Sequence, residues 1–123
     1  MVEAIKSIES VIQQILARDS QFEDPGKRLG YGTAGFRANA KFLPRAFFRV
    51  GLLVAMRAKS VGRVGVMITA SHNHHADNGV KIIEPDGSML VQDWEAFSEM
   101  IVNAEDLGSV LQQINVNAFR DLP

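Results

Sequence analysis

Hydrophobic residues recur at helical spacing in four segments of the chain. In segment 2–18 the apolar residues follow at steps of three and four, which places them on one face of a helix: Ile5, Ile8, Ile12, Ile15 and Leu16. Segment 44–59 repeats Phe48, Leu52 and Met56 at steps of four, while its arginines, Arg45, Arg49 and Arg57, fall mostly off that apolar side. Two shorter helices are predicted from Trp94, Phe97, Ile101 and Ala104, and from Leu107, Val110, Leu111 and Ile114.

Two apolar runs between these helices are typical of strands. The run 63–70, RVGVMITA, is short, continuous and rich in β-branched residues, which predicts a strand buried on both faces of an α/β sheet. The run 80–85, VKIIEP, predicts a second strand. We expect a turn at Asn78-Gly79 before this strand and another turn at 85–87 after it.

A third strand is expected at 31–37, YGTAGFR, with a turn at 33–35 where small residues allow a close approach of the backbone. The predicted fold class is α/β, with a mixed, mainly parallel sheet flanked by helices. A chain of 123 residues fits one domain. We expect a helical lead-in over 1–30 and an α/β core over 31–123.

Composition narrows the class of protein. Hydrophobic residues make up 46% of the chain and charged residues 22%, which is ordinary for a globular protein. The formal net charge of −1 gives no electrostatic bias toward nucleic acid or an anionic membrane, so a small, roughly neutral partner is expected. The absence of cysteine excludes disulfides and thiolate metal sites. With no signal-peptide pattern and no run near the roughly 20 apolar residues of a membrane span, we expect a soluble, cytoplasmic protein.

The stretch 69–81, TASHNHHADNGVK, holds more reactive side chains than a connecting loop needs. One interpretation is a metal site, because His72, His74 and His75 lie within four residues and imidazole binds zinc or copper. Neighbouring histidines in one loop rarely aim at the same ion without further ligands, however. A second interpretation is an ordinary polar surface loop.

A third interpretation is a nucleophile loop at the carboxyl end of a strand, where open α/β sheets bind their ligands. Ser71 occupies that position. A serine hydroxyl can hold a phosphoryl group when nearby cations neutralise its charge, and Arg37, His72 and Lys81 are the candidate cations. Spacing alone leaves the three interpretations open.

Three blocks of residues resemble the amino-terminal domain of the α-D-phosphohexomutases: GTAGFR at 32–37, TASHN at 69–73 and DNGVK at 77–81. The continuation at 84–95 is most similar to the branch of that family that acts on N-acetylglucosamine phosphates. The resemblance implies an isomerase that interconverts N-acetylglucosamine 6-phosphate and N-acetylglucosamine 1-phosphate in UDP-N-acetylglucosamine biosynthesis. The reaction would pass through a phosphoserine and a bisphosphorylated sugar.

The resemblance also implies roles for individual residues. Ser71 would hold the phosphoryl group and transfer it to the sugar. Arg37 would hold phosphate oxygens with its planar, permanently charged fork. Lys81 would act as general acid or base on the sugar hydroxyl. His72 would polarise or orient the phosphoryl group.

Three further positions would shape the phosphate site. Thr33 and Gly35 would let the first loop approach the phosphate closely, and Asn73 would shape the nucleophile loop. The family uses magnesium, held by the serine phosphate and by three aspartates of a later domain, so Ser71 is the one metal ligand expected in this chain.

The chain departs from the family pattern in two respects. It contains no D-G-D-G-D-R block, so we expect a fragment that is inactive alone, with an unfinished sheet edge that favours self-association. His74 stands where the family usually has proline, which should loosen the nucleophile loop. The alternative functions are a non-catalytic, truncated module that binds a partner, and a mutase of another hexose phosphate.

Overall fold

The structure is a computed structural model that describes residues 2–70 and 74–113. Along the chain the elements are α1 (Val2–Asp19), β1 (Tyr31–Gly32), β2 (Gly35–Asn39), the 3-10 helix η1 (Ala40–Phe42), α2 (Pro44–Val61), β3 (Gly65–Ile68), β4 (Asp77–Ile83), α3 (Gln92–Val102) and α4 (Leu107–Gln113). The four predicted helices are confirmed, with ends that differ by a few residues. None of the helices within these ranges is long and apolar enough to cross a membrane.

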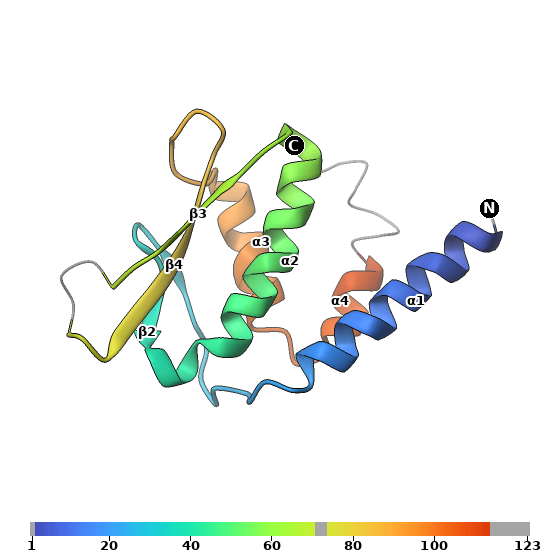
Figure 1. Ribbon diagram of the computed structural model, residues 1–123, viewed down its shortest axis with the longest axis horizontal. Coiled ribbons are helices and arrows are strands. Elements are labelled where there is room, and N and C mark those ends of the chain that lie inside the picture. The colour runs from blue at the N-terminus through green and yellow to red at the C-terminus, as the bar shows by residue number, and fades with distance from the viewer. Residues whose placement is uncertain (1, 71–73, 114–123) are drawn as a thin grey trace.

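The elements form three layers, the sheet and two pairs of helices (Figure 1). Helices α2 and α3 pack against each other beside the sheet, and α1 and α4 pair on the far side of these two helices. The core between the layers is apolar; its fully or almost fully buried side chains include Phe36, Leu53, Ile82, Trp94 and Ile101. The α/β class is therefore confirmed.

Strand direction differs from the sequence-based prediction. The strand order is β1-β2-β4-β3, and the three neighbouring pairs of the described sheet are all antiparallel rather than mainly parallel. Short connections explain two of these pairs, β1–β2 and β3–β4, because short turns join antiparallel strands and parallel neighbours need a long crossover. Helix α2 does make such a crossover from β2 to β3, but β4 inserts between these two strands.

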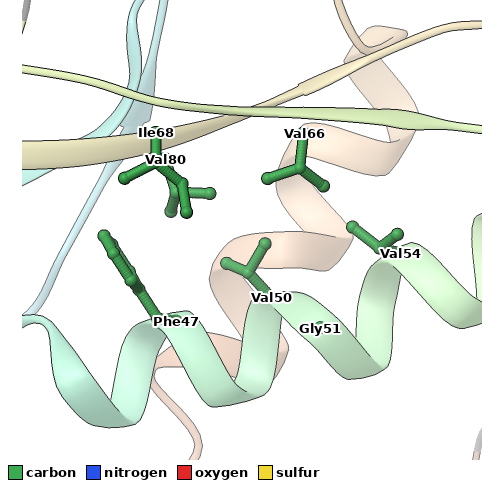
Figure 2. A pocket seen from close by; sticks show the side chains of 7 residues that line it. All are labelled: Phe47, Val50, Gly51, Val54, Val66, Ile68 and Val80. Carbon is green, nitrogen blue, oxygen red and sulfur yellow. The ribbon is translucent and has the colours of Figure 1, made fainter.

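Strand β3 is exposed, contrary to the expected burial on both faces. Val66, Met67 and Ile68 are 46%, 47% and 58% exposed. Among the described strands β3 pairs with β4 alone, so it is an edge strand of the described sheet. Its side chains on the helix side line an apolar groove against α2, which is formed by Phe47, Val50, Gly51, Val54, Val66, Ile68 and Val80 (Figure 2). The continuous apolar run 63–70 therefore forms an edge strand of the described sheet and not a buried central strand.

The Asn78-Gly79 dipeptide lies inside β4 and not in a turn, which corrects the second prediction for this region. The chain turns earlier, where the Asp77 amide donates to the His74 carbonyl over 2.9 Å. Gly79 is required for packing instead, because a Cβ there would lie 2.7 Å from the Phe36 carbonyl oxygen. The predicted turn at 85–87 is confirmed, with Gly87 at a φ of 88°.

Candidate functional site

Arg37 and Lys81 lie on the same face of the sheet. Successive side chains of a strand point to opposite faces. Phe36, Val80 and Ile82 are buried in the core that the sheet forms with the helices. Arg37 and Lys81 are each one position from these residues, so both lie on the face turned away from the helices, and both are half-buried.

The strand register brings the three sequence blocks together on that face. Arg37 of the first block is the register partner of Gly79 in the third. The Thr69 amide of the second block donates to the Gly79 carbonyl over 3.0 Å. One row across the sheet therefore contains a residue from each block. Lys81 lies two residues further along β4, in the next row whose side chains point to this face, with Met67 as its partner on β3.

The guanidinium of Arg37 reaches across this row to the chain that leads into Ser71. Its Nη1 donates to the Ala70 carbonyl, and its Nε donates to the Ala34 carbonyl over 3.3 Å. The path runs over Gly79, where an added Cβ would lie 2.8 Å from the Arg37 Cγ. The glycine thus leaves the space that the arginine side chain occupies.

Gly35 makes the second close approach at this site. Its φ is 78°, and a Cβ there would lie 2.2 Å from the Val80 carbonyl oxygen and 2.6 Å from the Lys81 Cβ. The close contact that the structure shows at Gly35 is thus with the backbone of β4. Thr33 lies exposed in the turn between β1 and β2.

Ser71, His72 and Asn73 lie outside the described residues, so their expected roles stay predictions. His74 is the first described residue after them, and its Nδ1 accepts a hydrogen bond from the Ala76 amide over 3.1 Å. Together with the Asp77 bond to its carbonyl, this ring contact closes the turn that precedes β4. Within the described ranges, no group of three or more His, Cys, Asp or Glu side chains could hold a metal ion.

Tyr31 was missed by the sequence interpretation, and it bonds the strand that bears Lys81 from the helix-facing side of the sheet, where its ring packs on Phe36. Its hydroxyl oxygen accepts the Ile82 amide over 2.9 Å, directly beside Lys81. Burial, the largest cause, raises the pKa of the Tyr31 phenol above its ordinary value of 10.0, while the hydrogen bond from Ile82 opposes that rise. The sequence signal was weak, since a tyrosine at the start of a short strand is common.

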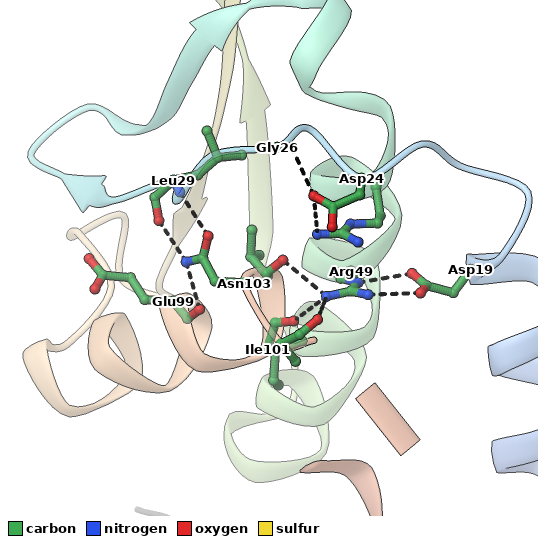
Figure 3. Close-up of polar contacts among 11 residues, drawn as sticks. Asp19, Asp24, Gly26, Leu29, Arg49, Glu99, Ile101 and Asn103 are labelled. Atoms are coloured by element: carbon green, nitrogen blue, oxygen red, sulfur yellow. Dashed lines mark hydrogen bonds and ion pairs between the residues drawn. The ribbon is translucent and has the colours of Figure 1, made fainter. Parts of the chain in front are cut away.

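Arg49 was also missed, and it holds the layers behind the site together (Figure 3). Its Nε and Nη2 donate to the Asp19 carboxylate over 2.9 and 2.8 Å. Its Nη1 donates to the carbonyls of Ile101, Val102 and Ala104 at the end of α3. This buried guanidinium therefore connects α1, α2 and α3, and its role is structural.

Comparison with known proteins gives these blocks a family context. The sequence model described as "Phosphoglucomutase/phosphomannomutase, alpha/beta/alpha domain I" matches residues 51–108. The phosphoacetylglucosamine mutase of Arabidopsis thaliana is 47% identical over 111 residues, which cover 85% of this chain and 20% of that protein. The resemblance to the phosphohexomutases is confirmed. The human phosphoacetylglucosamine mutase is 49% identical over 82 residues, 66% of this chain and 15% of that protein.

Solved phosphohexomutase structures share the fold. Aspergillus fumigatus N-acetylphosphoglucosamine mutase, a serine-to-alanine variant in complex with glucose 1,6-bisphosphate, superposes with a TM-score of 0.81 at 40% identity over 88% of this chain and 21% of that chain. The enzyme from the same organism in complex with GlcNAc-6P and magnesium gives 0.70 at 38% identity, covering 85% and 20%. This chain therefore spans about a fifth of the length of the phosphohexomutases that it matches.

Proposed function

We propose that this chain is the phosphoserine-bearing domain of a phosphoacetylglucosamine mutase. The observation that supports it most is the convergence of Arg37, Lys81 and the backbone leading into Ser71 on one open face of the sheet. Such a face provides cations at fixed positions on two neighbouring strands, as expected of one wall of a site. The rest of the site would come from polypeptide beyond this fifth of the relatives' length.

The proposed reaction is a phosphoryl transfer in two halves. The bond between phosphorus and the Ser71 oxygen breaks, a bond to the free sugar hydroxyl forms, and the Ser71 oxygen is left to be phosphorylated again. Lys81 takes the proton of the sugar hydroxyl and passes it to the leaving Ser71 oxygen, so that the serine hydroxyl forms again, and Arg37 and His72 stabilise the charge on the phosphoryl oxygens. The bisphosphorylated sugar then returns its other phosphate to Ser71 by the reverse chemistry, with Lys81 giving the proton back.

The loop residues have supporting roles in this proposal. Thr33 and Gly35 bring the hairpin backbone toward the phosphate, and Asn73 shapes the nucleophile loop. The Gly35 backbone already packs against Lys81, so the hairpin that bears Arg37 also contacts the strand that bears Lys81. Placement of this kind accounts for most of the rate of phosphoryl-transfer enzymes.

Magnesium belongs to the proposal, with the Ser71 phosphate as one ligand. When bound, such a hard cation neutralises charge on the transferring phosphoryl group. The described residues supply no ligand set of their own, so the remaining ligands would lie outside this part of the chain. A relative that has been solved with magnesium supports the choice of metal.

The proposed substrate pair is N-acetylglucosamine 6-phosphate and 1-phosphate, on the route to UDP-N-acetylglucosamine in the cytoplasm. Relatives named phosphoacetylglucosamine mutase support this choice, as does a relative solved with GlcNAc-6P. The bisphosphorylated intermediate is supported by the relative that was solved with glucose 1,6-bisphosphate.

Replacing the nucleophile tests the proposal. In the full-length protein that contains this sequence, Ser71→Ala should abolish turnover, and it should remove the covalent phosphate that we expect peptide mass mapping to find at this position in the unaltered protein. The matched control is Ser109→Ala, because Ser109 is an exposed serine on α4, far along the chain from the site. Near-normal activity of the Ser71 variant would disprove the assignment.

The second candidate function is a module that binds a partner through β3, and the exposed edge and apolar groove favour it. The partner we propose is a second copy of the chain, since β3 has no charged residue to oppose edge-to-edge pairing. Val66→Lys should then shift the 123-residue chain toward monomer in sedimentation, whereas Val11→Lys, at a valine of similar exposure on α1, should not. A chain that is monomeric at every concentration would exclude self-association.

A further inference from the structure

The hydroxyl of Tyr31 adds one hydrogen bond to β4 beyond the first residues of β2, where the β2–β4 ladder stops. The first register pair between these strands at this end is Phe36 with Val80. The Gly79 carbonyl faces β3, because it accepts a hydrogen bond from the Thr69 amide. Backbone groups of successive residues face opposite neighbouring strands, so those of Val80 and Ile82 face β2. Opposite Ile82 the chain before β2 lies in the turn that joins β1 and β2, so no strand residue accepts from the Ile82 amide there. The Tyr31 hydroxyl accepts this hydrogen bond instead, over 2.9 Å.

Tyr31 is itself fixed from two directions. Its ring meets the Phe36 ring edge-on, with centroids 5.0 Å apart and planes at 86°. Its backbone amide donates to the Glu99 Oε1 of α3 over 2.8 Å. Rotation of the side chain and sliding of the backbone are therefore both opposed.

Helix α3 also holds the segment before Tyr31. The Asn103 side chain accepts a hydrogen bond from the Leu29 amide and donates one to the Leu29 carbonyl (Figure 3), and both bonds are 2.7 Å long. Glu99 pairs with Arg28 over 3.0 Å. The hydroxyl of Tyr31 is thus presented to β4 by a segment that is anchored on the packed core.

We propose that Tyr31 is a positioning residue, which fixes β4 at Lys81 against the hairpin that bears Arg37. This inference rests on the proposed phosphoryl transfer. Tyr31 does not touch the reacting groups; it acts on the amide next to Lys81, while Gly35 of the same hairpin packs against the backbone of Val80 and Lys81. Two supports, one hydroxyl and one glycine, set the distance between the general base and the phosphate-binding arginine.

The test is Tyr31→Phe in the full-length protein, which removes the hydroxyl and keeps the ring. We expect kcat to fall about tenfold with KM changed less than about twofold, because a small displacement of catalytic groups lowers the rate of chemistry more than it weakens binding. The matched control is Ser98→Ala, which removes another buried hydrogen bond, from Ser98 to the Glu95 carbonyl over 2.6 Å on α3. Ser98→Ala should keep kcat, even where it lowers the melting temperature as much.

Three results separate the possibilities. If Ser71→Ala is inactive and Tyr31→Phe keeps its kcat, the positioning role is wrong and the proposed function stands. If Ser71→Ala is active, the proposed function itself fails. If Tyr31→Phe does not fold, hydrogen exchange of the unaltered protein decides, since the Ile82 amide must exchange slowly when the hydroxyl holds it and fast exchange would overturn the inference.

Discussion

Arg37 makes two contacts that a lysine could not make together. Its Nε and Nη1 donate to two different carbonyls, those of Ala34 and Ala70, so its fork joins the hairpin to the end of the chain before Ser71. A lysine has one charged nitrogen at the end of a flexible stem. The position of Arg37 is therefore defined by the geometry of the guanidinium as well as by its charge.

We predict that Arg37→Lys in the full-length protein lowers kcat by about tenfold or more, because one of the two anchoring bonds is lost while the charge remains. Steady-state kinetics measure the effect. Arg28→Lys is the control, since the Arg28 side chain is 68% exposed and its ion pair with Glu99 can also be made by a lysine. Equal rates for the two variants would show that charge alone matters at position 37.

At this scale the sequence predicted motif residues and missed residues whose partners are distant. Arg37, Gly35 and Lys81 could be found because they belong to compact blocks, and the structure does place them together. Arg49 was expected on a polar side of its helix, but it is buried because Asp19, thirty positions earlier, pairs with it. Periodicity reports which side chains are apolar, and it cannot report a charged pair formed between two helices.

The β1–β2 hairpin contains the single tyrosine of the chain, which makes its environment measurable. Burial raises the pKa of the Tyr31 phenol above 10.0, with further raising by the Glu95 and Glu84 carboxylates against the opposing bond from Ile82. A raised pKa means that the folded state keeps the phenolic proton longer than the unfolded state does. The hairpin's stabilisation from this group is thus present below pH 10 and is lost as the pH rises through the folded pKa.

Tyrosinate absorbance during alkaline titration checks this prediction. The folded chain should titrate above 10.0, and the same chain in concentrated urea should titrate near 10.0. Chemical unfolding at rising pH should show the loss of stability in the unaltered protein and its absence in Tyr31→Phe. Coincident titration of the folded and unfolded chains would contradict the buried hydroxyl.

Element by element, helices were easier to predict than strands. The 3.6-residue period of α1 and α2 appears in the sequence, whereas β3 was mistaken for a buried strand because its apolar run looks the same at an edge. Strand direction was wrong for a related reason, since it depends on which strand inserts next to which. The Asn-Gly pair in β4 was misinterpreted because a close approach by Phe36, and not a turn, requires Gly79.

For the whole molecule, the buried pair of Asp19 and Arg49 is the main polar connection among the described layers that reaches α1. We predict that Asp19→Asn lowers the free energy of unfolding by about 3 kcal/mol, because a buried guanidinium then lacks its charged partner. Urea unfolding measures it. Asp24→Asn is the control: the Asp24 side chain is 70% exposed and 3.6 Å from Arg45, so a loss under about 1 kcal/mol is expected.

Among the described strands β3 pairs with β4 alone, which has a consequence for how accurately the chain places the proposed nucleophile. A slip of one residue between β3 and β4 would shift the chain entering Ser71 along the sheet by about 3.3 Å. It would also exchange the two faces, turning Met67 into the groove and Val66 toward Lys81. The register between β3 and β4 is held by the hydrogen bonds of their ladder and by the Arg37 contact with the Ala70 carbonyl. Arg37 thus also serves as a register lock, which keeps the strand before Ser71 from sliding.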